Sequence, residues 1–282
     1  MQVFKHINDM QAWSQAQKKQ GLTIGLVPTM GYLHAGHLSL VQAAREQCDR
    51  VIVSIFVNPT QFGAGEDFAD YPRDIERDCE LLRQAQTDAV FAPDAREMYA
   101  QDFNTWVEVK GEITAKLCGA SRPNHFKGVT TVVSKLFNIC LPDRAFFGQK
   151  DVQQAMIIEK MVRELNFPLS IVRVPIMREA SGLAMSSRNV YLSSEQKEQA
   201  LVLSQSLQKA AQLIAAGERN PAHIKGVIRD MIAQSPEAVI DYAEIYDAHG
   251  LSDVEVVQGS VLIALAVKFG TTRLIDNLIV EV

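Results

Sequence analysis

The chain has 282 residues, and its 28 Lys and Arg against 33 Asp and Glu give a net charge of −5 with neutral histidines. Hydrophobic residues make up 47% and charged residues 22%, which excludes a disordered or collagen-like chain. No basic cluster of the kind that binds nucleic acid is present, and the apolar stretches are much shorter than the roughly 20 residues of a membrane span.

Short β-branched runs alternate with helical patterns through the first two thirds of the chain. Strands are predicted at 23–27, 51–57, 89–92, 145–147 and 170–174, and helices at 37–48, 72–86, 129–139 and 151–165. Repeated strand–helix–strand units pair their strands in parallel. We therefore predict a Rossmann-like, doubly wound α/β domain over residues 1–176, with its ligands beyond the carboxyl ends of the strands.

The remaining residues, 177–282, have a different pattern. A polar loop, REASGLAMSSRN, precedes a long predicted helix at 194–216, with Ser193 or Ser194 as its cap and Gly217 at its end. A second helix is predicted at 221–234 and strands at 239–246, 261–267 and 273–275. This pattern predicts a smaller α+β domain joined closely to the first.

The N-terminal residues MQVFKHINDMQAW lack the order of a secretory signal, so we expect a cytoplasmic protein. Four cysteines are scattered without a CxxC motif: Cys48, Cys79, Cys118 and Cys140. Their spacing favours free structural thiols over a metal site or disulfides.

The first candidate site is PTMGYLHAGH, which runs from the first predicted strand into a helix. The free amides at a helix start favour anions, and His34 and His37 can both donate to phosphate oxygens. Gly31 and Gly36 would let a nucleotide approach closely. A nucleotide phosphate site is the favoured interpretation, with a structural turn or a metal pair as alternatives.

The second candidate site is NPTQFG, at the end of the apolar run VIVSIFV. The amides of Asn58 and Gln61 can both donate and accept hydrogen bonds, as recognition of hydroxyl or carboxylate groups requires. Judged alone, a polar turn around Pro59 is the stronger interpretation.

The third candidate site is FGQKDVQQ, again where a strand enters a helix. Lys150 would bring a positive charge to phosphates, while Asp151 and Gln154 would point the same way from the first helical turn. Asp151 is equally well interpreted as a helix cap. Upstream, SRPNHFKGV offers Arg122, His125 and Lys127, either facing an anion or simply solvated.

The fourth candidate site is MSSRN in the polar loop between the predicted domains. Ser186 and Ser187 can bond phosphate oxygens, and Arg188 can bind them in a bidentate way. Such a loop could close over a triphosphate, whereas the alternative is a helix-capping loop. No P-loop is present, and GAGEDF is a poor match to a dinucleotide fingerprint.

Taken together and in this order, these segments resemble the pantothenate synthetase (pantoate–β-alanine ligase) family. The matching stretches are PTMGYLHAGH, SIFVNPTQF with EDFADYPR, SRPNHFKGV, FGQKD with QQ, and GLAMSSRN with RLIDN. They extend from Val27 to Asn277. The family belongs to the HxGH nucleotidyltransferases, and MSSR stands where related enzymes carry KMSKS.

The resemblance implies that ATP, pantoate and β-alanine give pantothenate, AMP and pyrophosphate through a pantoyl adenylate. The resemblance also implies a homodimer. Mg²⁺ is expected through the ATP phosphates, with no metal ligand from protein side chains, and the charge and the short apolar stretches disfavour nucleic acid and a membrane as partners. His37 takes the role of the acid that assists pyrophosphate departure, while His34, Lys150 and Arg188 would neutralise charge. In-line attack on phosphorus needs positioning and charge neutralisation and no protein nucleophile.

The resemblance also implies ligand contacts along the chain. Pantoate is placed at Gln61 and Gln154, with β-alanine near Gln61. The residues assigned to ATP are Met30, Gly31, Tyr32, Leu33, His34, Ala35, Gly36, His37, Gly148, Gln149, Lys150, Asp151, Met177, Met185, Ser186, Ser187 and Arg188.

Three positions depart from the family pattern: Gln149 replaces the more common Glu, Asn124 replaces Gly, and Ser181 replaces an Asp before GLA. Three other functions stay open from the residues alone. They are another HxGH nucleotidyltransferase acting on a phosphorylated cofactor precursor, an ATP-binding regulatory protein, and an aminoacyl-tRNA synthetase fragment.

Overall fold

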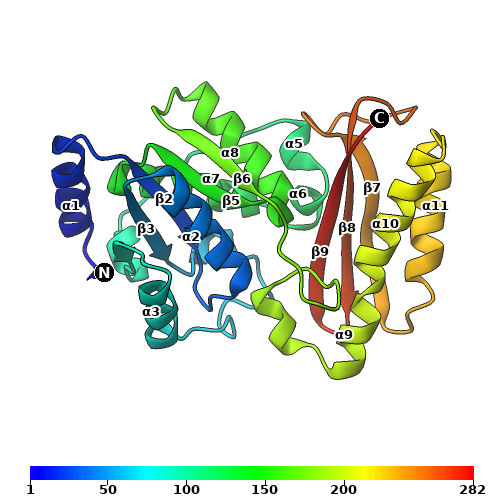
Figure 1. Cartoon of the computed structure of the whole chain (residues 1–282), viewed down its shortest axis with the longest axis horizontal. Helices are drawn as coiled ribbons and strands as arrows, with labels where there is room; N and C mark the ends of the chain where they lie inside the picture. Colours follow the sequence, from blue (N-terminus) through cyan, green and yellow to red (C-terminus); the bar gives the residue numbers. More distant parts are fainter. The chain divides into compact units, whose positions relative to one another are not determined.

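The computed structural model describes all 282 residues, which form two compact units. The first unit comprises Met1–Lys110 and Arg122–Pro175, and the second comprises Gly111–Ser121 and Ile176–Val282 (Figure 1). The predicted division after residue 176 lies beside the last of these boundaries, but the sequence did not indicate that the segment 111–121 belongs to the second unit.

The first unit contains a six-stranded sheet whose paired strands are all parallel, in the order β1-β4-β3-β2-β5-β6. Its strands are β1 (Gln2–Phe4), β2 (Ile24–Thr29), β3 (Arg50–Ile55), β4 (Ala89–Phe91), β5 (Arg144–Gly148) and β6 (Ser170–Val174). The chain proceeds from β2 outward through β3 and β4, and later returns to place β5 and β6 on the other side of β2. This reversal makes the carboxyl ends of β2, β3 and β5 the place where a ligand is expected.

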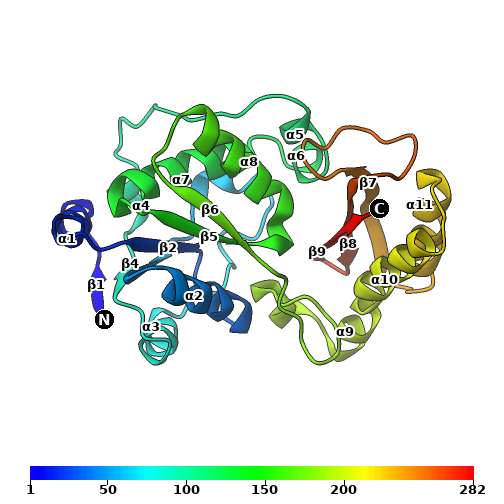
Figure 2. The ribbon, with the colours of Figure 1, turned by 45° about the horizontal axis from the view of Figure 1, so that its top comes forward.

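Helices cover both faces of this sheet, which confirms the predicted doubly wound fold. They are α1 (Ile7–Lys19), α2 (Ala35–Gln47), α3 (Ile75–Gln84), α4 (Ala95–Met98), α7 (His125–Cys140) and α8 (Val152–Glu164). Successive side chains of a strand point to opposite faces of the sheet, so each face has its own apolar cluster. Leu26 and Ile52 pack with α1, α7 and α8 on one face, whereas Val27 and Val53 pack with α2 and α3 on the other. Figure 2 shows α7 and α8 on one side of the sheet and α2 and α3 on the other.

The second unit contains an antiparallel sheet of β7 (Ala238–Asp247), β8 (Ser260–Phe269) and β9 (Thr272–Glu281). Its helices are α5 (Glu112–Ala115), α6 (Cys118–Ser121), α9 (Ser194–Ala200), α10 (Val202–Ala215) and α11 (Pro221–Ile232). Apolar residues of α10 and α11 pack on the sheet in one core. The segment 111–121 belongs here because its polar groups bond to this unit, as in the bond from Ser121 Oγ to Asp241 Oδ2 at 2.9 Å.

The structure corrects several predicted elements. The single helix predicted at 194–216 is wrong, because the Leu201 amide bonds to the Glu198 carbonyl three residues back, and the chain divides there into α9 and α10. The capping role of Ser193 is confirmed, and Gly217 follows α10 with a φ of +97°. The strand predicted at 273–275 extends over the whole of β9, and β1, α1, α4, α5 and α6 were not predicted.

None of the helices combines the length and the apolar character that a membrane span requires. All four cysteines are free thiols, and Cys118 lies in α6.

Candidate active site

The turn after β2 is the first of the predicted sites. The Thr29 hydroxyl donates to the Ser54 carbonyl at 2.7 Å and accepts from the Gly31 amide at 3.2 Å. Gly31 has a φ of +83°, and a Cβ there would lie 3.0 Å from Ile55 Cγ2 and 3.1 Å from Asp78 Oδ2. Glycine is therefore required at this position both by the backbone conformation and by the space available.

A buried carboxylate holds the next two residues of this turn. Asp78 is 1% exposed, and its two oxygens accept from the amides of Tyr32 and Leu33, each at 2.7 Å. Arg77 lies beside it, with Nη1 3.6 Å from Asp78 Oδ1 and its guanidinium 5.2 Å from the centre of the Tyr32 ring. Burial raises the pKa of Asp78, while the two amide donors and Arg77 oppose that rise.

The two histidines form the capping box of α2. The Nδ1 atom of His34 accepts from the Gly36 amide at 3.1 Å, and the Nδ1 atom of His37 accepts from the His34 amide at 3.3 Å. The ring centroids are 4.1 Å apart. Because both Nδ1 atoms accept, the proton of each neutral ring is on Nε2, so the helix start presents two N–H donors.

The electrostatics of the site keep these rings neutral. Burial, Lys150 and Arg77 lower the pKa of His34 to about 4, and burial, His34 and Lys150 hold the pKa of His37 well below 6.5. The two rings are thus hydrogen-bond donors without a charge near pH 7. The Lys150 ammonium, which follows β5 in the chain, contributes to the lowering of both pKa values.

Lys150 and Asp151 lie in a short 3₁₀ turn, Gln149–Asp151, between β5 and α8. Asp151 occupies the N-cap position of α8, as the capping interpretation predicts, but its side chain makes no cap hydrogen bond there. Its carboxylate instead opposes the lowering of the His34 pKa. Gln154 lies in the first turn of α8.

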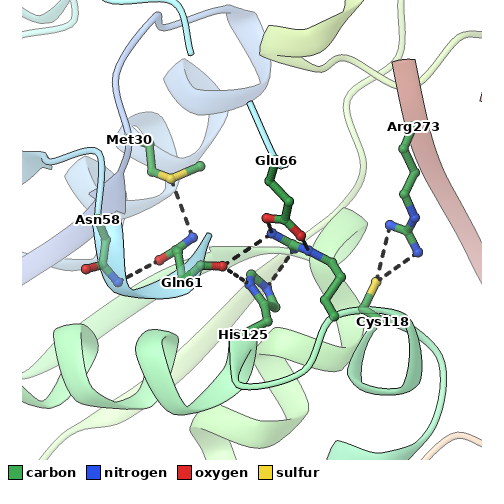
Figure 3. Close-up of polar contacts among 8 residues, drawn as sticks. Met30, Asn58, Gln61, Glu66, Cys118, His125 and Arg273 are labelled. Carbon is green, nitrogen blue, oxygen red and sulfur yellow. Dashed lines mark hydrogen bonds and ion pairs between the residues drawn. The ribbon is translucent and has the colours of Figure 1, made fainter. Parts of the chain in front are cut away.

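The turn after β3, Pro59–Gln61, lies next to the histidine turn. Asn58 caps it, with Oδ1 accepting from the Thr60 amide at 3.4 Å and from the Tyr99 hydroxyl at 2.8 Å. The Gln61 side chain accepts from Asn58 Nδ2 at 3.0 Å and directs its Nε2 at Met30 Sδ, 3.5 Å away (Figure 3). The polar turn expected here is present, and it carries an amide oriented toward the first site.

The three basic residues of SRPNHFKGV have partners within the first unit. Arg122 forms a bidentate pair with Glu66, His125 contacts the Gln61 carbonyl, and the Lys127 ammonium lies 4.9 Å from the Trp106 ring centre. Burial and Arg122 lower the pKa of His125 to about 4. Arg122 and His125 are therefore structural supports of the Gln61 turn.

The MSSR loop lies in the second unit, where residues 177–188 form a hairpin that we call the MSSR hairpin. The Met185 amide donates to the Met177 carbonyl at 3.0 Å, and the Ser186 hydroxyl accepts from the Arg188 amide at 3.2 Å. Arg178 makes a bidentate pair with Asp276 at 2.7 and 2.9 Å, which braces the hairpin. Ser187 is 7% exposed, whereas Met177 is 42% exposed.

A family model described as pantoate-beta-alanine ligase matches residues 2–279. The chain belongs to this family. A pantothenate synthetase of Syntrophomonas wolfei is 65% identical over the full length of both chains. The crystal structure of pantothenate synthetase from Thermus thermophilus has a TM-score of 0.93 at 43% identity and covers 99% of each chain.

A further solved structure is pantoate-β-alanine ligase from Francisella tularensis complexed with beta-gamma ATP and beta-alanine. It has a TM-score of 0.80 at 34% identity and covers 99% of this chain and 97% of its own. These similarities establish that the chain is a ligase of this family.

The structure accounts for two of the three departures from the family pattern. Asn124 has a φ of +65°, a left-handed conformation that asparagine tolerates and that glycine adopts freely. The Ser181 hydroxyl accepts from the Leu183 amide at 3.5 Å, so it supplies an oxygen acceptor for the turn without the charge of an Asp. Gln149 begins the 3₁₀ turn before α8, where it replaces a negative charge by a neutral amide.

Sequence reasoning missed three charged residues of this region: Glu66, Arg77 and Asp78. Glu66 stands in EDFADYPR, a stretch that carries the family resemblance but indicates no role for this residue. Asp78 is 46 positions from Tyr32 in the sequence, and no local pattern marks it as the acceptor for the histidine turn.

Proposed function

We propose that this chain activates pantoate with ATP and then joins it to β-alanine, through an enzyme-bound pantoyl adenylate and with the residues named below. The observation that carries the proposal is the pair of Nε2–H donors of His34 and His37 at the start of α2, close to Lys150. Family membership and the relative complexed with beta-gamma ATP and beta-alanine support the choice of substrates.

ATP would lie along the turn after β2, from Met30 to His37, and along Gly148 to Asp151. The dipole at the start of α2 favours its phosphates, and Gly31 allows the turn before this helix to pack closely on Ile55 and Asp78. Mg²⁺ enters as part of the substrate, on the β and γ phosphates. The imidazoles and the ammonium gathered here suit phosphate oxygens and not Mg²⁺, an ion that prefers oxygen ligands, and Asp151 brings the one carboxylate of these two segments.

In the first step a carboxylate oxygen of pantoate attacks the α-phosphorus, and the bond from phosphorus to the β-phosphate bridging oxygen breaks. Pyrophosphate leaves with the negative charge that develops on that oxygen. His37 and His34 donate hydrogen bonds to the departing group, and Lys150 adds a positive charge. Because the His37 pKa is held well below 6.5, its contribution is that of a neutral donor.

Gln61 and Gln154 would bind pantoate. The Gln61 Nε2 faces only the Met30 thioether, a weak acceptor that a carboxylate or hydroxyl oxygen of the substrate replaces at low cost. In the second step the neutral amine of β-alanine attacks the acyl carbon, and AMP leaves with the bridging oxygen. The product amide releases one proton to solvent.

The MSSR hairpin completes the proposal. Arg188, together with Ser186, Ser187, Met177 and Met185, would contact the nucleotide and exclude water from the adenylate. The first unit would then bind ATP and pantoate, and residues 177–282 would act as a lid. We further propose that the chain works as a homodimer in the cytoplasm, with a mass in solution of twice 31.3 kDa.

Product analysis tests this proposal. The chain is incubated with MgATP and pantoate, with and without β-alanine, and the products are identified by mass spectrometry. We expect pantothenate and AMP in equal amounts only when β-alanine is present. Without β-alanine, about one equivalent of pyrophosphate per site is expected. Multiple turnovers of pyrophosphate with a phosphorylated cofactor precursor, and none with pantoate, would contradict the proposal.

A further inference from the structure

We propose that His125, held by the Arg122–Glu66 ion pair, is a positioning residue that fixes the Gln61 turn for pantoate. This inference rests on the proposed role of Gln61 in binding pantoate. His125 does not face the substrate itself in this proposal, and it acts through the backbone of Gln61.

The hydrogen bonds of His125 define both its tautomer and its role. Its Nε2 lies 3.0 Å from Arg122 Nη1, and its Nδ1 lies 2.8 Å from the Gln61 carbonyl oxygen. A guanidinium only donates, so Nε2 must be the acceptor and the ring proton must be on Nδ1. His125 therefore donates to the Gln61 carbonyl, and at 8% exposure it does so out of contact with most solvent (Figure 3).

The ion pair with Glu66 fixes the Arg122 guanidinium, which determines the tautomer of His125. Arg122 Nε and Nη2 lie 2.7 and 2.6 Å from the two oxygens of Glu66, a bidentate geometry that allows one orientation of the guanidinium plane. Arg122 Nη2 is also 3.4 Å from the Gln61 carbonyl. The Glu66 carboxylate thus orients the Arg122 guanidinium, which in turn orients the His125 imidazole. The cationic Arg122 and the neutral His125 both donate to the Gln61 carbonyl.

The start of α7 holds the same turn from a second direction. A Cβ on Gly128 would lie 2.4 Å from the Thr60 carbonyl oxygen, so this helix packs directly against the backbone of the turn. The Gly128 carbonyl also accepts from Asn58 Nδ2 at 3.2 Å, and that same nitrogen donates to the Gln61 side chain. The backbone and the side chain of Gln61 are therefore both held by hydrogen bonds, and its Nε2 stays directed at Met30 Sδ.

This arrangement predicts an effect on pantoate and not on ATP. His125→Phe keeps an aromatic ring but removes the donor, and His125→Asn restores an N–H close to the position of Nδ1. In the full-length chain we expect His125→Phe to raise the KM for pantoate five- to tenfold, the effect of one lost orienting hydrogen bond, with the KM for ATP within twofold. His125→Asn should recover most of this loss. The matched control is His6→Phe, at a histidine whose side chain is 71% exposed, and it should leave both KM values unchanged.

Gln61→Ala, measured in parallel, separates this inference from the proposed function. If Gln61→Ala leaves the pantoate KM unchanged, the assignment of pantoate to Gln61 is wrong. If Gln61→Ala raises that KM while His125→Phe leaves it within twofold, or raises the KM values for pantoate and ATP equally, the positioning role is overturned.

Should His125→Phe fail to fold, Arg122→Lys provides the same test, because lysine cannot hold Glu66 and donate to His125 in one fork. A pantoate KM raised about threefold with an unchanged ATP KM supports the inference. An unchanged pantoate KM contradicts it.

Discussion

Two turns of the first unit, one after β2 and one after β3, are each held by a side chain distant in the sequence, but with opposite hydrogen-bonding roles. Asp78 accepts from two amides in the turn that leads to His34. His125 donates to a carbonyl in the turn that ends at Gln61. The first support is a carboxylate and the second a neutral imidazole.

The difference follows from the backbone groups that each turn leaves unpaired. Tyr32 and Leu33 lie just before the N-cap of α2 and present N–H groups that need acceptors, so a carboxylate fits there. A single 3₁₀ turn ends with carbonyls that find no partner within it, and there a donor fits. A neutral imidazole serves this purpose without adding a second positive charge beside Arg122.

Removing the donor that the first turn presents should have the largest effect. We expect His37→Ala to slow adenylate formation in a single turnover by about 100- to 1,000-fold, with little change in the ATP KM, because the lost bond acts mainly as charge develops on pyrophosphate. Rapid-quench measurement of pyrophosphate provides the rate. His37→Asn keeps an acceptor for the His34 amide but has no donor at Nε2, so it should be as slow as His37→Ala. An unchanged rate in either variant contradicts the role given to His37.

Removing the support of that turn should act on stability as well. Asp78→Ala leaves the Tyr32 and Leu33 amides buried without their acceptor, and we expect unfolding free energy to fall by about 2–4 kcal/mol. Urea denaturation measures this. Asp78→Asn retains one carbonyl oxygen and should lose less. A loss below about 1 kcal/mol for Asp78→Ala would mean that the amides find other partners.

Lowering the pH should destabilise the fold through protonation of His125, which supports the Gln61 turn. Its pKa is about 4 in the folded chain and near 6.5 when unfolded, so between these values the unfolded state binds more protons and stability falls as the pH falls. The resulting loss in the free energy of unfolding reaches about 3 kcal/mol at pH 4. His125→Asn removes it, so the free energy of unfolding of the variant should decline less steeply from pH 6.5 to pH 4. Parallel pH profiles of the two proteins would contradict the assignment.

The smallest effect is expected from a methyl group in the first turn. Gly31→Ala places a Cβ 3.0 Å from Ile55 Cγ2 at a positive φ, and should cost about 1–2 kcal/mol and raise the ATP KM. Gly21→Ala is the matched control, because its φ is +75° with nothing within 4 Å of the added Cβ. The control should cost about 1 kcal/mol or less and leave the ATP KM unchanged. Equal effects of the two substitutions would show that close packing at Gly31 has no role.

Local patterns predicted most of the first unit. The apolar run at β3 and the helical periodicity of α2 and α8 depend on neighbouring residues, so their strands and helices were found within a few positions of their ends. The pairing of His34 with His37 also follows from a spacing of three. The fold class then placed the loops after β2, β3 and β5 at one edge of the sheet.

Long-range pairs escaped prediction because nothing local marks them. The partner of Asp78 is 46 positions away, and Glu66 meets Arg122 across 56 positions. The place of Gly111–Ser121 in the second unit could not be predicted either, because it depends on hydrogen bonds to residues far along the chain, such as the bond from Ser121 to Asp241. Tautomers and lowered pKa values depend on these tertiary contacts, and so the neutral state of the histidines could be inferred only from the structure.

The transfer of an oxygen atom tests most directly whether the two turns bring pantoate to the α-phosphate of ATP. Pantoate labelled with ¹⁸O in both carboxylate oxygens is converted with MgATP and β-alanine, and the ¹⁸O content of each product is determined by mass spectrometry. A pantoyl adenylate leaves one ¹⁸O in AMP and one in the amide of pantothenate. Unlabelled AMP, or label found in orthophosphate together with ADP, would contradict the mechanism.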